Sequence, residues 1–214
     1  MRNLFNLDNP FVQFLARVGD LIIVNVLFLL CCLPVVTIGA AAAALYTAAF
    51  RIVRGNEGRA LGLFFSSFRQ CLRRAVPLWL LLALALAAAG LDIWLFAAVP
   101  GALRLLGIPF ALLLLIALFT AGYAFPLLSQ FDNSVRGTLK NALILSLGYL
   151  QRTIVITALN VFPFVLLFFN TYLFLTTGFI WVFLYFAAIA VLNAKLLEKV
   201  FAPYREEKKE EEKA

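Results

Sequence analysis

Four segments of the chain are apolar around their whole circumference and long enough to cross a bilayer as helices. A helix without a polar face is typical of burial in lipid or protein, not of a water surface. Spanning ~30 Å of hydrocarbon takes about 20 residues at ~1.5 Å each. The pattern therefore predicts membrane-spanning helices at Ala75–Phe96, Leu105–Leu128, Thr153–Phe169 and Gly178–Leu197.

A further apolar block, residues 21–50, is too long for one upright span, at about 45 Å if helical throughout. Pro34 and Gly39 interrupt it, and proline removes a backbone donor and clashes with the preceding turn. We expect one helix over about 10–33 and a second over about 38–53. Two topologies stay open: a hairpin, with a cytoplasmic N-terminus and six membrane segments, or one kinked span, with an external N-terminus and five.

Two connections between the apolar segments, at 60–72 and 135–150, carry apolar residues at helical spacing with basic residues beside them. This pattern is typical of amphipathic helices on a membrane surface. The predicted fold is therefore all-α: a polytopic transmembrane helical bundle of five to six membrane segments with two cytoplasmic amphipathic helices. We expect one domain over 1–200, followed by a charged, solvated cytoplasmic tail over 201–214.

Composition agrees with a membrane protein. Hydrophobic residues make up 64% of the 214 residues and charged residues 14%, against about 45–50% and about 25% in soluble domains. A soluble chain of this length has too high a surface-to-volume ratio to bury that much apolar surface. We therefore expect the lipid bilayer as a partner.

The net charge of +7 is arranged in short basic stretches between the apolar segments. Six arginines lie in 51–74, three basic residues in 129–152 and six in the tail from Lys195 onward, but only one in 97–104 and none in 170–177. This alternation follows the positive-inside rule and not the pattern of a nucleic-acid groove. It places the C-terminus in the cytoplasm, and Arg2 and Arg17 agree with a cytoplasmic N-terminus.

Two common catalytic signatures are missing from the sequence. The chain has no histidine, which removes Ser-His and Cys-His catalysis and most zinc sites, and it has no P-loop. We expect no catalytic residue, no cofactor, no metal and no nucleic-acid partner. Asp92, the one acid in these four spans, is expected to pair with Arg104 near the outer membrane surface. Interhelical hydrogen bonds are expected from four embedded amides: Asn25, Asn160, Asn170 and Asn193.

A recognisable set of residues lies in the first apolar block and just after it. Its members are Asn25, Leu30, Cys32, Pro34, Thr37, Gly39, Leu45, Tyr46, Arg54 and Gly55. This set resembles the YesL family of small bacterial membrane proteins, whose domain has no established function. The segments FFSSFRQ at 64–70 and FDNSVRGTLKNALIL at 131–145 look like the family's other marks, and the resemblance covers roughly 5–200.

The resemblance implies a location in the bacterial cell membrane and a functional or structural role for six motif residues: Asn25, Pro34, Thr37, Gly39, Tyr46 and Arg54. Genes of the family often stand beside those of carbohydrate ABC transporters, which implies an accessory or permease-like subunit. The chain lacks the Gly-containing cytoplasmic loop by which ordinary ABC permeases engage their ATPase, so a self-sufficient permease is not expected.

Two functions therefore stay open. The first is a non-enzymatic accessory subunit that binds ABC transporter subunits through the two amphipathic helices. The expected docking residues are Phe64, Phe65, Phe68, Arg69, Lys140 and Asn141. The second is a stand-alone transporter or channel for a small solute that uses the broken first helix, because discontinuous helices often line transport sites.

Overall fold

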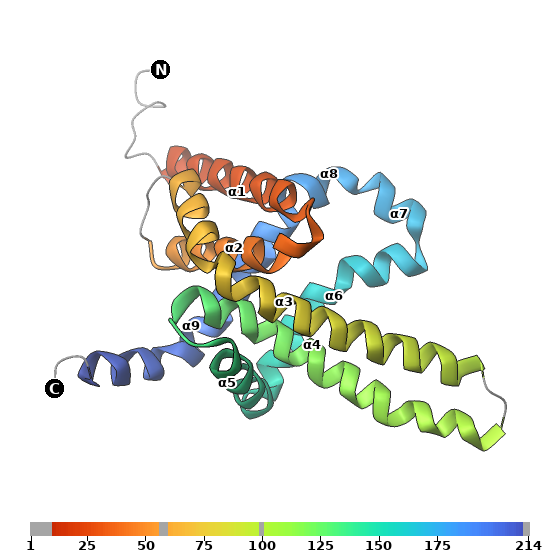
Figure 1. Cartoon of the computed structure of the whole chain (residues 1–214). Coiled ribbons are helices and arrows are strands. Elements are labelled where there is room, and N and C mark those ends of the chain that lie inside the picture. Colours follow the sequence, from red (N-terminus) through yellow and green to blue (C-terminus); the bar gives the residue numbers. More distant parts are fainter. Residues whose placement is uncertain (1–9, 56–59, 99–100, 212–214) are drawn as a thin grey trace.

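The computed structural model describes residues 10–55, 60–98 and 101–211, and these residues are helical apart from short connections. The α-helices are α1 (Pro10–Cys32), α2 (Ile38–Val53), α3 (Ala60–Ala98), α4 (Gly107–Gln130), α5 (Val135–Gly148), α6 (Leu150–Phe169), α7 (Thr171–Thr176), α8 (Gly178–Ile180) and α9 (Phe186–Glu211) (Figure 1). Two 3-10 turns, Val35–Thr37 and Gly101–Leu106, and a π-helix, Trp181–Tyr185, complete the described fold. The predicted all-α class is confirmed.

Five helices in the described part of the chain are long and apolar enough to cross a membrane. They are Val35–Val53, Leu61–Ala98, Arg104–Gln130, Leu150–Phe169 and Gly178–Arg205. Each of the four spans predicted from the sequence lies within one of them, and α1 adds a shorter apolar stretch, Val18–Cys32. The chain is thus a multi-pass, membrane-type helical protein whose apolar surface fits a lipid bilayer.

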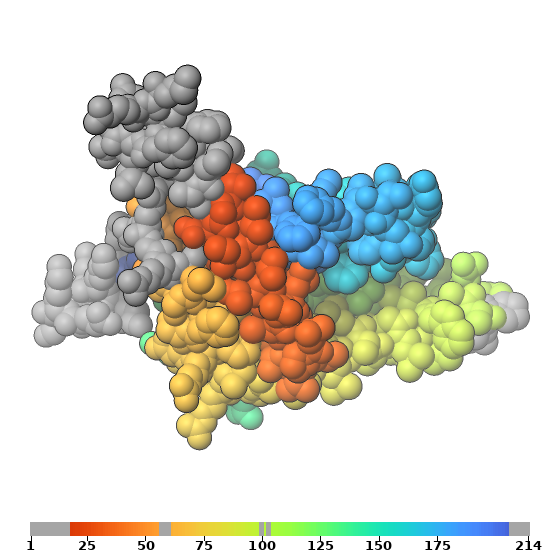
Figure 2. All heavy atoms as spheres, turned by 90° about the horizontal axis from the view of Figure 1, so that it is seen from above, coloured from red at the N-terminus to blue at the C-terminus, as the bar shows by residue number. Residues whose placement is uncertain are grey.

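The first apolar block breaks where its proline predicts. Helix α1 ends at Cys32 and α2 begins at Ile38, and α2 folds back beneath α1 (Figure 1). In the space-filling view, α1 lies in the middle of one face, with the start of α3 on one side and α7–α8 on the other (Figure 2). Arg2 and Arg59, on which part of the predicted topology rests, lie outside the described residues, so the side of each terminus stays a prediction.

Helix α2 is the centre of the packing. It contacts α1, α3, α4 and α9, and 56% of its apolar stretch is buried, against 11% in α3 and 17% in α4 and α6. The reason is its composition, because alanines dominate its first half and let the neighbouring helices approach closely. The most buried of these five apolar helices is therefore the one that follows the proline break.

The predicted separate helix at 60–72 is wrong. Residues 60–98 form one continuous helix of 39 residues, about 58 Å long at 1.5 Å per residue. Nothing between Leu72 and Ala75 stops a helix, so the arginine pair Arg73–Arg74 changes its polarity without ending it. The second predicted amphipathic helix does form separately, as α5.

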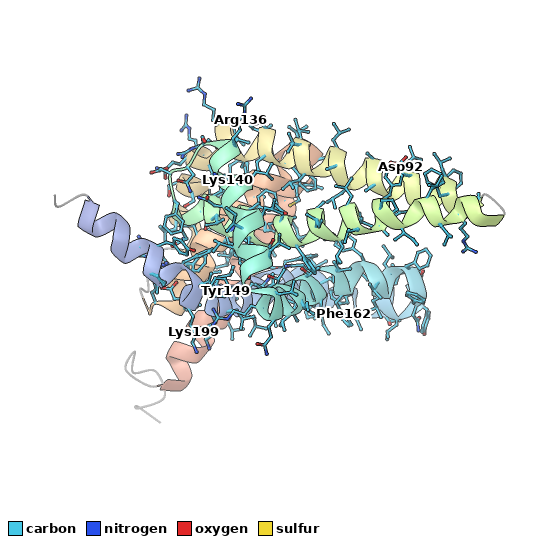
Figure 3. The ribbon with its side chains drawn as sticks, turned by 90° about the horizontal axis from the view of Figure 1, so that it is seen from below. Asp92, Arg136, Lys140, Tyr149, Phe162 and Lys199 are labelled. Atoms are coloured by element: carbon cyan, nitrogen blue, oxygen red, sulfur yellow. The ribbon has the colours of Figure 1, made fainter. Side chains whose placement is uncertain are left out.

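The far half of the α3–α4 hairpin stands apart from the rest. The side chain of Trp79 contacts the α1–α2 turn, and α3 then continues to Ala98, about 28 Å further. In Figure 3, Asp92 lies far along this hairpin, away from Arg136, Lys140 and Lys199. The predicted ion pair of Asp92 with Arg104 is wrong, since the ion pairs among the described residues do not include it.

Helix α9 continues without a break past the predicted domain boundary at residue 200, as far as Glu211. Val200 and Phe201 are fully buried, and the Phe201 ring packs against Phe50 and Phe131, with ring centroids 5.9 and 5.7 Å away. The packed part of the protein therefore includes the first residues of the predicted tail.

Candidate functional site

The turn between α1 and α2 satisfies its own backbone groups. The Thr37 hydroxyl donates to the carbonyl oxygens of Cys31, at 2.6 Å, and Pro34, at 2.8 Å. The indole Nε1 of Trp79 donates to the carbonyl oxygen of Val35 at 2.8 Å and holds the turn against α3. The carbonyls freed by the break are thus used inside the chain, as membrane-embedded backbone requires.

Gly39 lies where three helices meet. A Cβ atom placed on it would stand 2.6 Å from the Cβ of Trp79, 2.7 Å from the carbonyl oxygen of Ala75 and 3.0 Å from the Phe125 ring. Atoms do not approach so closely without moving the backbone. Glycine at this position therefore lets α2 rest directly on α3 and α4.

Asn25 joins α1 to the π-helix near the C-terminal end of the chain. Its side chain is fully buried, and its Nδ2 donates to the carbonyl oxygens of Trp181, at 3.1 Å, and Val182, at 2.7 Å. Its Oδ1 accepts from the backbone N–H of Ala187 at 2.7 Å. A π-helix disturbs the regular i→i−4 pattern of an α-helix. The Asn25 amide bonds to three backbone groups at this place, two in the π-helix and one at the start of α9.

A second buried amide cluster lies beside α2. Asn193 Nδ2 donates to the Tyr46 hydroxyl oxygen at 3.1 Å and to Asn160 Oδ1 at 3.4 Å. Interhelical bonding is thus confirmed for Asn25, Asn160 and Asn193. Asn170 differs, because its side chain caps the first turn of α7 by accepting from the Leu173 N–H.

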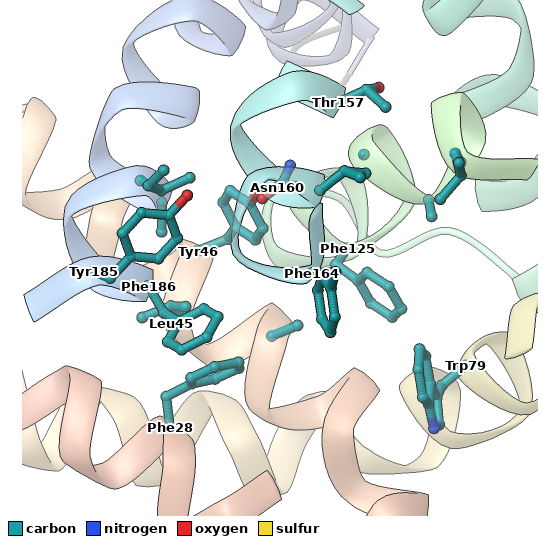
Figure 4. A pocket seen from close by; sticks show the side chains of 17 residues that line it. Phe28, Leu45, Tyr46, Trp79, Phe125, Thr157, Asn160, Phe164, Tyr185 and Phe186 are labelled. Carbon is teal, nitrogen blue, oxygen red and sulfur yellow. The ribbon is translucent and has the colours of Figure 1, made fainter. Parts of the chain in front are cut away.

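A cavity of about 280 Å³ opens next to this cluster (Figure 4). Helices α1, α2, α3, α4, α6 and α9 and the π-helix contribute to its wall. Its aromatic lining residues are Phe28, Tyr46, Trp79, Phe125, Phe164, Tyr185 and Phe186. Leaving an enclosed volume of this size empty would cost on the order of 7 kcal/mol, at ~24 cal/mol per Å³. A cavity of this size is therefore expected to be filled.

An ionic cluster ties together the ends of α2, α4 and the middle of α9. Arg54 donates through Nε and Nη2 to the two carboxylate oxygens of Glu198, each at 3.2 Å, and also to Gln130 Oε1. Arg205 donates to the same carboxylate at 2.9 Å. The Arg54 guanidinium also lies 5.4 Å from the centroid of the Phe50 ring.

Replacing Arg54 with alanine is expected to lower the free energy of unfolding by about 1 kcal/mol, because the side chains of this network remain about 30% exposed. Thermal unfolding in mild detergent measures the loss, which should shrink in 1 M salt. Arg73→Ala is the matched control, because Arg73 is exposed and makes no ion pair with the described residues. An equal loss in both variants would contradict a specific role of the cluster.

The six expected docking residues do not share one environment. Phe64 is fully buried and stacks on the partly buried Phe68, with ring centroids 6.4 Å apart. A partner cannot reach Phe64 in this conformation, so its placement on a docking surface is wrong. Phe64 belongs to the same buried cluster as the alanines of α2, because the start of α3 packs against α2. Phe65, by contrast, is 52% exposed, and Arg69 is exposed as well.

Lys140 and Asn141 are exposed on α5. The opposite face of this helix is buried through Thr138, Ala142 and Leu145, and the Ser134 hydroxyl caps its start. Figure 3 shows Lys140 and Arg136 on this helix. An ion pair at 2.6 Å between Arg74 and Asp132 links α3 to the segment before α5.

The motif residues of the first block therefore serve separate contacts. Pro34, Thr37 and Gly39 shape the turn and its packing, while Asn25 and Tyr46 each bond to the C-terminal third of the chain. The sequence pattern did not reveal Glu198 as the partner of Arg54, because the two are 144 positions apart. No periodicity signals such a pairing.

The fold and these contacts define a polytopic α-helical protein of the membrane type. Residues 21–93, about a third of the chain, match a protein family described as "Protein of unknown function, DUF624". No curated protein and no solved structure matches the chain. The match spans α1 from Leu21, all of α2 and α3 as far as Ile93, and it attaches no activity to them.

Proposed function

We propose that this protein is a non-enzymatic membrane subunit that docks onto another membrane protein through Phe65 and Arg69 of α3 and Lys140 and Asn141 of α5. These four residues form the docking surface. The observation that carries the proposal is the exposure of Phe65 directly beside the buried Phe64. Aromatic and arginine side chains are the residues that most often anchor interfaces.

Helix α5 supports the same role. Its first half presents Arg136 and Lys140, and its second half presents Leu143, Ile144 and Leu147, all exposed. A surface that is basic at one end and apolar at the other suits a partner embedded in the same bilayer. Basic residues also favour the anionic inner leaflet by about 1 kcal/mol each near the surface.

The partner is inferred from the resemblance to the YesL family. Because genes of that family stand beside those of carbohydrate ABC uptake systems, subunits of such a transporter are the expected partners. The setting is then the bacterial cell membrane, with the C-terminus in the cytoplasm. The domain match names no partner, so this assignment rests on the sequence resemblance alone.

The alternative of a stand-alone solute transporter has less support. Its expected substrate element, the break at Pro34, uses its polar groups within the turn and does not line the cavity. The cavity itself offers few polar atoms for a sugar. If the chain purifies without partner subunits and supports measurable solute flux in liposomes, this result would favour transport over docking.

Replacing Phe65 with alanine is expected to weaken recovery of the ABC subunits about thirtyfold, which corresponds to loss of a ~2 kcal/mol aromatic anchor. The measurement is affinity purification of the tagged chain from native membranes in mild detergent, with the transporter subunits quantified by mass spectrometry. The abundance of the chain itself should not change, since Phe65 contributes little to the core.

Leu84→Ala is the matched control for this experiment. Leu84 is 72% exposed on the same helix but in its membrane-spanning half, so the truncation should leave recovery unchanged. Full recovery of the transporter subunits with Phe65→Ala, or equal losses in both variants, would contradict docking through this surface.

A further inference from the structure

We propose that the cavity beside α2 holds part of the hydrocarbon chain of a membrane lipid. This inference goes beyond docking and involves different residues. The cavity borders the Tyr46–Asn160 cluster, and its wall is built by helices from both ends of the sequence. The lining, the opening and the size of the cavity each point to this occupant.

The lining is mostly hydrocarbon, and most of its polar groups are already paired; the exception is the buried Thr157 hydroxyl, which has no hydrogen-bond partner among the described residues. Trp79 Nε1 is committed to the Val35 carbonyl, the Tyr185 hydroxyl donates to the Leu159 carbonyl at 2.9 Å, and Asn160 Nδ2 donates to the Ile156 carbonyl at 2.9 Å. An apolar cavity of this kind stays dry and takes up apolar molecules, because water needs two to four polar partners.

The cavity continues into the surface that faces lipid. Phe164 of α6 lines the cavity and is 65% exposed, and Leu118 of α4 lines it and is half-buried. Figure 4 shows Phe164 beside Phe125, while Tyr46 and Asn160 lie together in another part of the wall. The neighbours of Phe164 on the outside of α6, Val165 and Phe168, are exposed and apolar. A chain from the bilayer therefore reaches the cavity without crossing a polar boundary.

The size fits part of one chain and excludes a whole lipid. A volume of about 280 Å³ is the space of about nine water molecules at ~30 Å³ each. A short run of methylenes has similar bulk, whereas a complete lipid is several times larger. Binding should therefore depend on the chain and not on the headgroup.

The test is lipid retention by the full-length chain, measured by native mass spectrometry during titration with two probes, dioleoyl phosphatidylcholine and dioleoyl phosphatidylglycerol. The wild type should retain one lipid, with the same affinity for both headgroups. Ala121→Leu, which fills the cavity from α4, should weaken retention of both about tenfold, because the added carbons displace methylenes of the chain.

Ala111→Leu is the matched control, since Ala111 is exposed on the same helix and does not line the cavity. It should retain lipid like the wild type. If Ala121→Leu does not fold, Ala42→Leu fills the same cavity from α2. No lipid on the wild type, retention only of the anionic probe, or unchanged retention in both filled variants would overturn the inference.

Discussion

Replacing Asn25 with alanine is expected to lower the free energy of unfolding by about 4 kcal/mol, the largest single effect predicted for this protein. The variant loses three hydrogen bonds and leaves the carbonyls of Trp181 and Val182 and the N–H of Ala187 buried without that partner. Each unsatisfied buried group costs about 1–3 kcal/mol, and the losses overlap because all three groups lie close together, in the π-helix and the first turn of α9.

Unfolding in mixed micelles of sodium dodecyl sulfate and mild detergent measures this loss. Asn141→Ala is the matched control, because Asn141 is exposed on α5 and makes no side-chain hydrogen bond with the described residues. Asn25→Asp should be at least as destabilising, since a carboxylate keeps acceptors but removes both donors and adds a buried charge. A loss of unfolding free energy below about 1 kcal/mol is typical of one interhelical hydrogen bond in a membrane. Such a small loss would contradict the role of Asn25 as the partner of three backbone groups.

Replacing Gly39 with alanine is expected to cost about 3 kcal/mol, at the upper end of what overpacking usually does. The new methyl group would lie 2.7 Å from the Ala75 carbonyl oxygen and 2.6 Å from the Trp79 Cβ. Neither atom is at the end of a flexible side chain, so α2 must move away from α3. That displacement would also disturb the hydrogen bond between Trp79 and Val35.

The same substitution elsewhere should have the opposite sign. Gly90 lies inside α3, and a Cβ there meets nothing within 4 Å. Gly90→Ala should therefore stabilise the protein by about 0.5–1 kcal/mol, because alanine has the higher helix propensity. Both variants can be compared by the same unfolding measurement. Destabilisation of equal size at Gly39 and Gly90 would indicate a general need for small residues and not a specific contact at Gly39.

Strong local patterns in the sequence were sufficient to predict most of the long helices. The apolar runs predicted the four long spans, because a residue in lipid needs only its own helix to satisfy its backbone. Pro34 predicted the end of α1 and the start of α2, since proline acts on the turn that precedes it. The same reasoning failed at 72–75, where a change from polar to apolar residues was interpreted as a helix end.

For the candidate sites too, the sequence predicted local features, and the tertiary structure decided the contacts. Amphipathic spacing showed that one face of 60–72 is apolar, and that face carries both Phe64 and Phe68. It did not show what covers the face, and the structure covers Phe64 with the chain's own core. Likewise, the sequence predicts interhelical hydrogen bonds from the embedded amides Asn160 and Asn193, but their mutual contact depends on how α6 crosses α9.

What the sequence by itself determined is thus the class of the protein, its apolar helices, the break at Pro34 and the basic loops, all of which depend on neighbours within a few turns. Only the tertiary structure decided that α2 is the central helix, that Asn25 bonds to a π-helix 156 positions away, and that a cavity forms beside Tyr46. The physical reason is that these features arise from close packing of helices far apart in the chain, where shape and small residues such as Gly39 set the contacts and leave no periodic signal.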